Sequence, residues 1–177
     1  MNESNIPCRT AFTTTILEEA KKDKHIFVVT TDSRGSVTLE NFAAELSGQS
    51  RTLLEGSDVT IISCGETVFH ALEAGKQIKN EGINAKVIDM YSIKPIDSET
   101  IISAAMETGH ILTVEEHSIY GGLGSIVAEI VTRHCPVKMK ILGFPDENVI
   151  NVKPLEILDY YGLTGKKLIT SAKALLT

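Results

Sequence analysis

Short apolar runs alternate with helix-length segments from about residue 57 onward, and this alternation is the strongest constraint on the fold. The apolar runs are rich in β-branched residues, and the segments between them repeat apolar residues at helical spacing. Strands joined by helices of this length form βαβ crossovers. The pattern predicts an α/β fold with a mostly parallel, doubly wound sheet. We expect strands over residues 59–63, 85–90, 110–114 and 138–143, and helices over residues 66–80, 98–107, 124–134 and 164–176.

The predicted helix ends carry local sequence signals. Ser98 can cap the helix that begins there, and Gly82 and Gly109 are suited to the left-handed conformation that ends a helix. Pro136 breaks the helix that precedes it. Beyond Phe144 we expect a long loop before the closing helix.

The first 50 residues are organised differently. Helical spacing over residues 10–22, a β-branched run over residues 26–31 and a second helical pattern over residues 38–46 predict a small α-β-α appendage. We therefore divide the chain into an appendage, residues 1–50, and a main domain, residues 51–177. Because one strand makes no sheet, we expect it to pair with the edge of the main sheet, to pair with another chain, or to stay poorly ordered. We favour docking through the two appendage helices in a homodimer.

Composition excludes several classes of partner. The chain has 17 basic and 23 acidic residues, a net charge of −6 and no basic block, so we expect no nucleic-acid partner. No apolar run approaches the roughly 20 residues that span a bilayer. Cys8, Cys64 and Cys135 are widely spaced and form no C-x-x-C pair, which argues against a disulfide framework or a zinc site. We expect a cytoplasmic protein without a membrane partner.

The stretch from Leu112 to Ser125 concentrates the features of a ligand-binding turn. An apolar strand ends in acids and a histidine, and a Gly-rich turn then leads into a helix. Unpaired amides and the helix dipole favour an anion at such a helix start. The candidate anion or partner turn comprises Glu116, His117, Gly121, Gly122, Gly124 and Ser125.

Other interpretations of this turn remain open. The glycines can serve only to reverse the chain. The spacing Gly-Gly-x-Gly differs from the dinucleotide fingerprint G-x-G-x-x-G, and no Lys-Ser/Thr follows to form a P-loop. Glu115 and Glu116 would repel a phosphate. His117 is either a general base or polar contact, or a solvated loop histidine.

The other polar residues at the predicted strand ends have ordinary structural explanations. Glu66, at a helix start, can complement the helix dipole, while Cys64 and His70 are expected to pack. The order of Ser, His and Asp gives no triad, and the acids do not alternate as metal ligands do. We assign no catalytic residue, no cofactor-binding residue and no metal ligand.

Several motifs of the main domain together resemble the C-terminal domain of the transketolase family. The resemblance extends in order from residue 51 to residue 177, and it includes the separately encoded C-terminal halves of bacterial transketolases. 1-Deoxy-xylulose-5-phosphate synthases and the β-subunits of 2-oxoacid dehydrogenase E1 are more distant relatives. The motifs that carry it are Leu53-Leu54-Glu55-Gly56-Ser57-Asp58-Val59, Glu81-Gly82-Ile83-Asn84-Ala85-Lys86-Val87-Ile88-Asp89-Met90, Ile93-Lys94-Pro95-Ile96-Asp97 and Val114-Glu115-Glu116-His117-Ser118-Ile119-Tyr120-Gly121-Gly122-Leu123-Gly124-Ser125.

The appendage resembles the first α-β-α segment of the pyrimidine-binding domain in the same halves. Arg9-Thr10-Ala11-Phe12 and the run ending Val28-Val29-Thr30-Thr31-Asp32 carry this resemblance. The family would continue after Leu46 with a long stretch that includes the glutamate contacting the thiamine ring. Here the chain reaches Arg51 within a few residues, so that glutamate maps to no residue of this sequence.

The resemblance implies an enzyme that uses thiamine diphosphate and Mg²⁺ to move a two-carbon ketol unit between sugar phosphates. Its partners would be a second copy, a separate diphosphate-binding half, or both. Because most of the pyrimidine-binding domain is missing, we expect no cofactor bound to this chain alone and no activity of the isolated chain. The alternative is a non-catalytic dimerisation or interaction module, or a degenerate fragment.

Overall fold

The computed structural model describes residues 8–23, 26, 50–148, 150 and 152–177. The chain divides into two compact units, Met1–Ser47 and Gly48–Thr177, which are described separately. Assignment of the first unit to a fragment of a pyrimidine-binding domain stays a prediction.

The first unit contains helix α1, Cys8–Lys22, which confirms the helix expected over residues 10–22. Pairs three residues apart bring the Lys21 ammonium 3.1 Å from the Glu18 carboxylate and the Lys22 ammonium 2.8 Å from that of Glu19. Such pairs stabilise an exposed helix slightly. The expected strand over residues 26–31, apart from Ile26, and the expected second helix lie outside the described residues.

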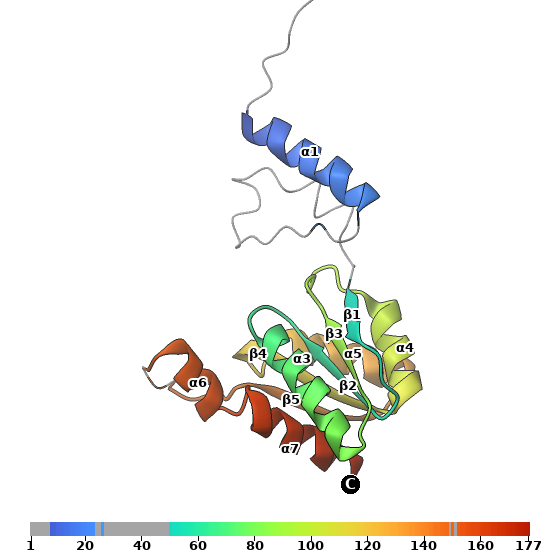
Figure 1. The fold of residues 1–177 in the computed structure, drawn as a ribbon, viewed down its shortest axis with the longest axis vertical. Coiled ribbons are helices and arrows are strands. Elements are labelled where there is room, and N and C mark those ends of the chain that lie inside the picture. Colours follow the sequence, from blue (N-terminus) through green and yellow to red (C-terminus); the bar gives the residue numbers. More distant parts are fainter. Residues whose placement is uncertain (1–7, 24–25, 27–49, 149, 151) are drawn as a thin grey trace, which may run out of the picture. The chain divides into compact units, whose positions relative to one another are not determined.

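The second unit alternates strands and helices in the predicted order (Figure 1). Its strands are β1 Arg51–Leu54, β2 Val59–Ser63, β3 Ala85–Asp89, β4 His110–Ser118 and β5 Lys138–Phe144. Its helices are α3 Thr67–Ile78, the 3-10 turn Lys79–Glu81, α4 Ser98–Thr108, α5 Leu123–His134, α6 Pro154–Tyr160 and α7 Gly165–Leu176.

The five strands of this unit form one sheet in the order β1-β3-β2-β4-β5. Strand β2 pairs in parallel with β3 and β4, β4 pairs in parallel with β5, and only β1 is antiparallel to its neighbour. The expected mostly parallel α/β sheet is therefore confirmed. Because β3 lies on one side of β2 and β4 on the other, the winding direction reverses between β2 and β4.

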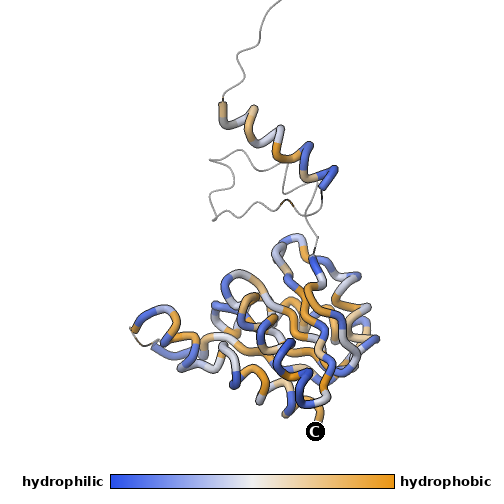
Figure 2. The backbone as a smooth tube through the Cα atoms, viewed as in Figure 1, coloured by the Kyte–Doolittle hydropathy of each residue, from blue (hydrophilic) through white to orange (hydrophobic). Residues whose placement is uncertain are grey.

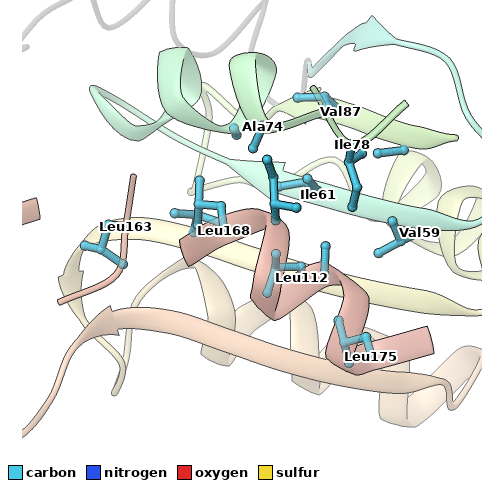
Figure 3. Packing of buried hydrophobic residues seen from close by; sticks show 14 of the residues in the cluster. Val59, Ile61, Ala74, Ile78, Val87, Leu112, Leu163, Leu168 and Leu175 are labelled. Carbon is cyan, nitrogen blue, oxygen red and sulfur yellow. The ribbon is translucent and has the colours of Figure 1, made fainter. Parts of the chain in front are cut away.

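Two apolar layers hold the helices against the sheet. On one face, α3 and α7 pack on residues such as Ile61 and Leu112, and these side chains interdigitate with Leu168 and Leu175 of α7 (Figure 3). On the other face, α4 and α5 pack on Ile62, Ile88 and Ile111. The central strands are accordingly hydrophobic along their length, whereas the helices alternate hydrophobic and hydrophilic positions (Figure 2). Burial of these layers is the main favourable contribution to folding.

Several predicted boundaries were wrong for identifiable reasons. Asp97, not Ser98, caps α4, since its carboxylate accepts a hydrogen bond of 3.0 Å from the Thr100 amide. Strand β4 continues past residue 114 to Ser118, because a register shift lets Ser118 pair with Phe144. The predicted left-handed ends at Gly82 and Gly109 are confirmed, with φ of 82° and 66°.

Two elements were missed. Strand β1 lies at the sheet edge and α6 lies within the expected long loop. Both are short, and α6 buries only Leu158 among its residues. Short elements with little buried surface leave almost no periodicity to detect.

The buried hydroxyl of Thr113 in β4 has no hydrogen-bond partner among the described residues. Replacing an unsatisfied hydroxyl with a methyl group removes a desolvation penalty. We expect Thr113→Val to raise the free energy of unfolding by about 1 kcal/mol in urea denaturation.

Thr60→Val is the matched control for this substitution. Thr60 is equally buried, but its hydroxyl lies 2.9 Å from that of Thr108. Loss of this hydrogen bond is expected to lower the free energy of unfolding by about 1 kcal/mol. Equal losses in the two variants would show that the Thr113 hydroxyl is satisfied.

Candidate functional site

The switch point between β2 and β4 is where a doubly wound sheet usually binds its ligand. Here β2 ends at Ser63, and Cys64, Gly65 and Glu66 connect it to α3. Strand β4 runs beside it to Glu116 and beyond. The site must therefore be built from these two strand ends, the start of α3 and the turn before α5.

Two buried hydroxyl side chains lie where β2 meets the start of α3. The Ser63 hydroxyl lies 2.8 Å from the Thr67 hydroxyl. Both contact the backbone carbonyl of Val114, at 3.0 Å and 3.1 Å respectively, and the Thr67 hydroxyl lies 2.8 Å from the Cys64 carbonyl oxygen. These contacts tie the start of α3 to β4 and satisfy buried polar groups internally.

The N-terminus of α5 is occupied by the carboxylate of Glu115. One carboxylate oxygen accepts a hydrogen bond of 2.7 Å from the Leu123 amide, and the other accepts one of 2.8 Å from the Gly124 amide. Glu115 is only 2% exposed. A buried charge is tolerated where it is hydrogen-bonded and faces the positive end of a helix dipole. The chain's own carboxylate thus takes the place that an external anion would occupy at these two amides.

Glycines are required where this turn meets the sheet. A Cβ atom at Gly122 would overlap with the Glu115 carboxylate, and one at Gly124 would overlap with Ile141 of β5. Gly121 has a φ of 75°, which favours glycine without any crowding. The Gly-rich sequence therefore serves the close approach of α5 to β4 and β5.

The structure brings the other predicted turn residues together. The Ser125 hydroxyl accepts a hydrogen bond of 2.8 Å from the Gly121 amide and lies 3.4 Å from the Ile119 carbonyl oxygen. His117 is mostly exposed, and its Nδ1 lies 3.0 Å from the Ser118 carbonyl oxygen. Because a carbonyl only accepts, Nδ1 carries the proton and donates it. An external ligand or partner for this turn stays a prediction.

Glu115 is the residue that sequence reasoning left out of the candidate site. The available signal was strand parity, because residues 111, 113 and 115 lie on the face of β4 that packs against α5. Glu116 lies on the opposite side of the strand and is exposed. This alternation predicts the position of Glu115 only because β4 extends beyond Val114.

Acidic residues lie at or near the carboxyl ends of β2, β3 and β4. Burial and the neighbouring Glu66 carboxylate raise the pKa of Glu116. Burial raises the pKa of Asp89 at the end of β3, and the nearby Arg51 guanidinium partly offsets this rise. Burial, together with the charges of Glu115 and Asp89, raises the pKa of the Cys64 thiol to about 12. Around Cys64 and Glu116, the neighbouring acids thus disfavour further negative charge.

A diphosphate group does not fit the described residues of this edge. The first amides of α5 already bind Glu115, and Glu66 and Glu116 stand at the rim. Within the described ranges, no cluster of three or more His, Cys, Asp or Glu side chains could hold a metal ion. No helix in that part of the chain is long and apolar enough to cross a bilayer.

The fold defines a doubly wound α/β domain in which the first amides of α5 are hydrogen-bonded by the chain's own Glu115. Residues 48–168 match the family described as transketolase, C-terminal domain. The chain belongs to this family, which confirms the resemblance seen in the sequence motifs.

Known proteins similar to this chain include transketolase subunits. The chain is 51% identical over 125 residues to a subunit of the apulose-4-phosphate transketolase of Phocaeicola vulgatus, and the alignment covers 71% of this chain and 40% of that subunit. It is 40% identical over 131 residues to 1-deoxy-D-xylulose-5-phosphate synthase of Heliobacterium modesticaldum, covering 72% and 20% respectively.

A solved structure is similar as well. It is described as a split gene transketolase, inactive beta4 tetramer, and it aligns with a TM-score of 0.70 and 41% identity. The alignment covers 73% of this chain and 42% of the other. The match thus spans less than half the length of the apulose-4-phosphate transketolase subunit and of this solved chain.

Removing one oxygen acceptor from the Glu115 cap should destabilise the fold. In Glu115→Gln the amide group would face a backbone N–H and leave one buried donor unpaired. We expect the free energy of unfolding to fall by about 2 kcal/mol, measured by chemical denaturation. Glu116→Gln, an exposed neighbour with the same chemistry, should change stability by less than about 0.5 kcal/mol. Equal effects would contradict the capping role.

The raised pKa of Cys64 predicts that its thiol reacts slowly with alkylating reagents. At about pH 8 almost none of it is thiolate, the form that reacts. Iodoacetamide should alkylate the exposed Cys8 at least about 100-fold faster than Cys64, as followed by peptide mass spectrometry. Unfolding in guanidinium chloride should equalise the two rates. Equal rates in the native protein would refute the buried environment of Cys64.

Proposed function

We propose that this chain is the C-terminal section of a thiamine-diphosphate-dependent, transketolase-like ketol transferase, acting on sugar phosphates in a complete assembly. The observation that carries this proposal is the match of residues 48–168 to the transketolase C-terminal domain, together with similarity to a transketolase subunit. Transfer of a two-carbon ketol unit requires the cofactor, whose chemistry belongs to the complete enzyme.

The isolated chain is proposed to be inactive. The Glu115 cap supports this, because it occupies the helix start at which the sequence offers an anion site. The glutamate that contacts the thiamine ring in the resembled family maps to no residue here. This domain would contribute packing surfaces and subunit contacts to the assembly, while other polypeptide segments bind the cofactor.

Two kinds of partner fit this proposal. One is a separate diphosphate-binding half. This fits because one similar protein is named a transketolase subunit and another is described as a split gene transketolase. The other is a second copy of this chain, since the similar solved structure is described as a beta4 tetramer. The three cysteines are free in the structure, which supports a reducing, cytoplasmic location.

The competing function is a non-catalytic dimerisation or interaction module. The same Glu115 cap is compatible with it, because a domain whose helix-start amides are occupied can still bind other chains. The neighbouring genes separate the two proposals. A reading frame that encodes a diphosphate-binding half favours the enzyme, and an isolated frame favours the module.

Calorimetric titration with thiamine diphosphate and Mg²⁺ tests the proposal directly. The chain alone should give no heat of binding. A mixture with a diphosphate-binding half encoded beside it should bind the cofactor and transfer a ketol unit between sugar phosphates. Binding of thiamine diphosphate by the isolated chain would overturn the assignment, and a mixture without ketol transfer would leave the interaction module as the function.

A further inference from the structure

We propose that the amino end of the sheet carries a binding site for a small primary ammonium ion with an apolar body, held between Asp58 and His110. The proposal goes beyond ketol transfer, because this site lies at the opposite end of the sheet from the Glu115 cap. It is carried by a cavity of about 480 Å³, whose lining includes Asp58, His110, Ile83 and Leu176. A volume of this size is typical of pockets that hold small ligands.

Three helical segments end at this cavity. Gly82 follows the 3-10 turn after α3, Thr108 is the last residue of α4, and Leu176 is the last residue of α7. The last carbonyl groups of a helix lack helical partners and give its end a partial negative charge. The last turn of α4 contains no basic residue, and Lys173 in the last turn of α7 is paired with Glu81. The helix ends therefore favour a cation in the cavity.

Asp58 contributes a carboxylate that is held in place. One of its oxygens accepts hydrogen bonds of 2.6 Å from the Asn84 amide and 3.3 Å from the Asn84 side-chain nitrogen. The other oxygen accepts one of 3.3 Å from the Ser57 hydroxyl. A carboxylate has about four acceptor positions, so one remains open. Asp58 forms no ion pair with another described residue, and its charge is thus available to a ligand.

His110 contributes a neutral acceptor. Its Nδ1 lies 3.2 Å from the carbonyl oxygen of Asp58 and 3.0 Å from that of Thr108. Because a carbonyl only accepts, Nδ1 carries the proton, and Nε2 of the neutral ring is then an acceptor. In the described part of the chain, no group donates a hydrogen bond to Nε2. The backbone contacts therefore fix one tautomer and leave an acceptor free at the cavity.

The lining selects the class of ligand. Ile83 and Leu176 are half-buried and give the cavity an apolar wall. No Lys or Arg side chain is among the described residues that line it, and Lys138, in register with His110 on β5, lies outside the lining. An anion would thus face the Asp58 carboxylate without a cation in the lining.

A metal ion and an ammonium ion differ in what they require of these groups. The cavity offers one carboxylate and one imidazole, and no described cluster contains three His, Cys, Asp or Glu side chains that could hold a metal. A primary ammonium has three N–H donors, which match the open position of Asp58, Nε2 of His110 and the Ser57 hydroxyl oxygen. An alkyl or aryl group attached to it would pack on the apolar wall.

Titration of the full chain with 2-phenylethylammonium, followed by amide NMR, tests this site. The amide signals of Gly82, Ile83 and His110 should shift, with a dissociation constant of about 1 mM for a ligand of about nine non-hydrogen atoms. Asp58→Asn keeps an acceptor for Asn84 but removes the charge, and it should weaken binding about 10-fold. His110→Asn retains a donor near the position of Nδ1 but removes Nε2, and it should weaken binding about fivefold.

Asp146→Asn is the matched control, because it removes an exposed carboxylate after β5, at the opposite end of the sheet, and should leave the dissociation constant unchanged. Two further probes isolate the charge: 2-phenylethanol lacks it, and 3-phenylpropanoate reverses it. Both should bind at least about 10-fold more weakly than the ammonium. The NMR spectrum verifies that each variant is folded.

Three results would overturn the site. These are no shift of the cavity amides at about 20 mM ammonium, a change of less than about twofold in either cavity variant, and equal binding of the uncharged or the anionic probe. None of them bears on the transketolase assignment, which the cofactor titration tests separately.

Discussion

The bidentate contact between the Glu115 carboxylate and the first amides of α5 fixes the centre of this domain. It places a charge where a helix dipole stabilises it, and it anchors α5 to the end of β4. The same contact explains the crowding at Gly122, whose Cβ would overlap with this carboxylate. The neighbouring backbone is equally close, since a Cβ at Gly143 on β5 would lie 2.5 Å from the His117 carbonyl oxygen. Strand, turn and helix therefore depend on one buried side chain.

This contact also determines how the fold can be used. A doubly wound sheet normally leaves helix amides open at its switch point, where they bind phosphate groups. Here the Leu123 and Gly124 amides are satisfied internally, and the Ser63 and Thr67 hydroxyls both hydrogen-bond to the Val114 carbonyl oxygen. The carboxyl edge carries exposed charged and aromatic side chains, among them Glu66, Glu116 and Tyr120. Such an edge suits contact with another polypeptide better than retention of a small anionic ligand.

The sequence predicted the layer structure well because strands and helices with large buried faces leave a strong periodic pattern. It did not predict β1 and α6, which bury few side chains and owe their form to the tertiary context. Asp97 was overlooked as a cap because a serine follows it directly. Glu115 was overlooked because its burial depends on the extension of β4, and that extension requires pairing with Phe144 on a strand distant in sequence.

Both lateral edges of the sheet are protected against pairing with another chain. An open edge strand invites pairing with another chain unless charge or irregularity prevents it. Strand β5 exposes Lys138 and Lys140, and the Lys140 ammonium lies 3.1 Å from the Ser171 hydroxyl. At the other side β1 has four residues, with a register shift between Thr52 and Leu54. Charged side chains and an irregular strand therefore oppose continuation of the sheet at both lateral edges.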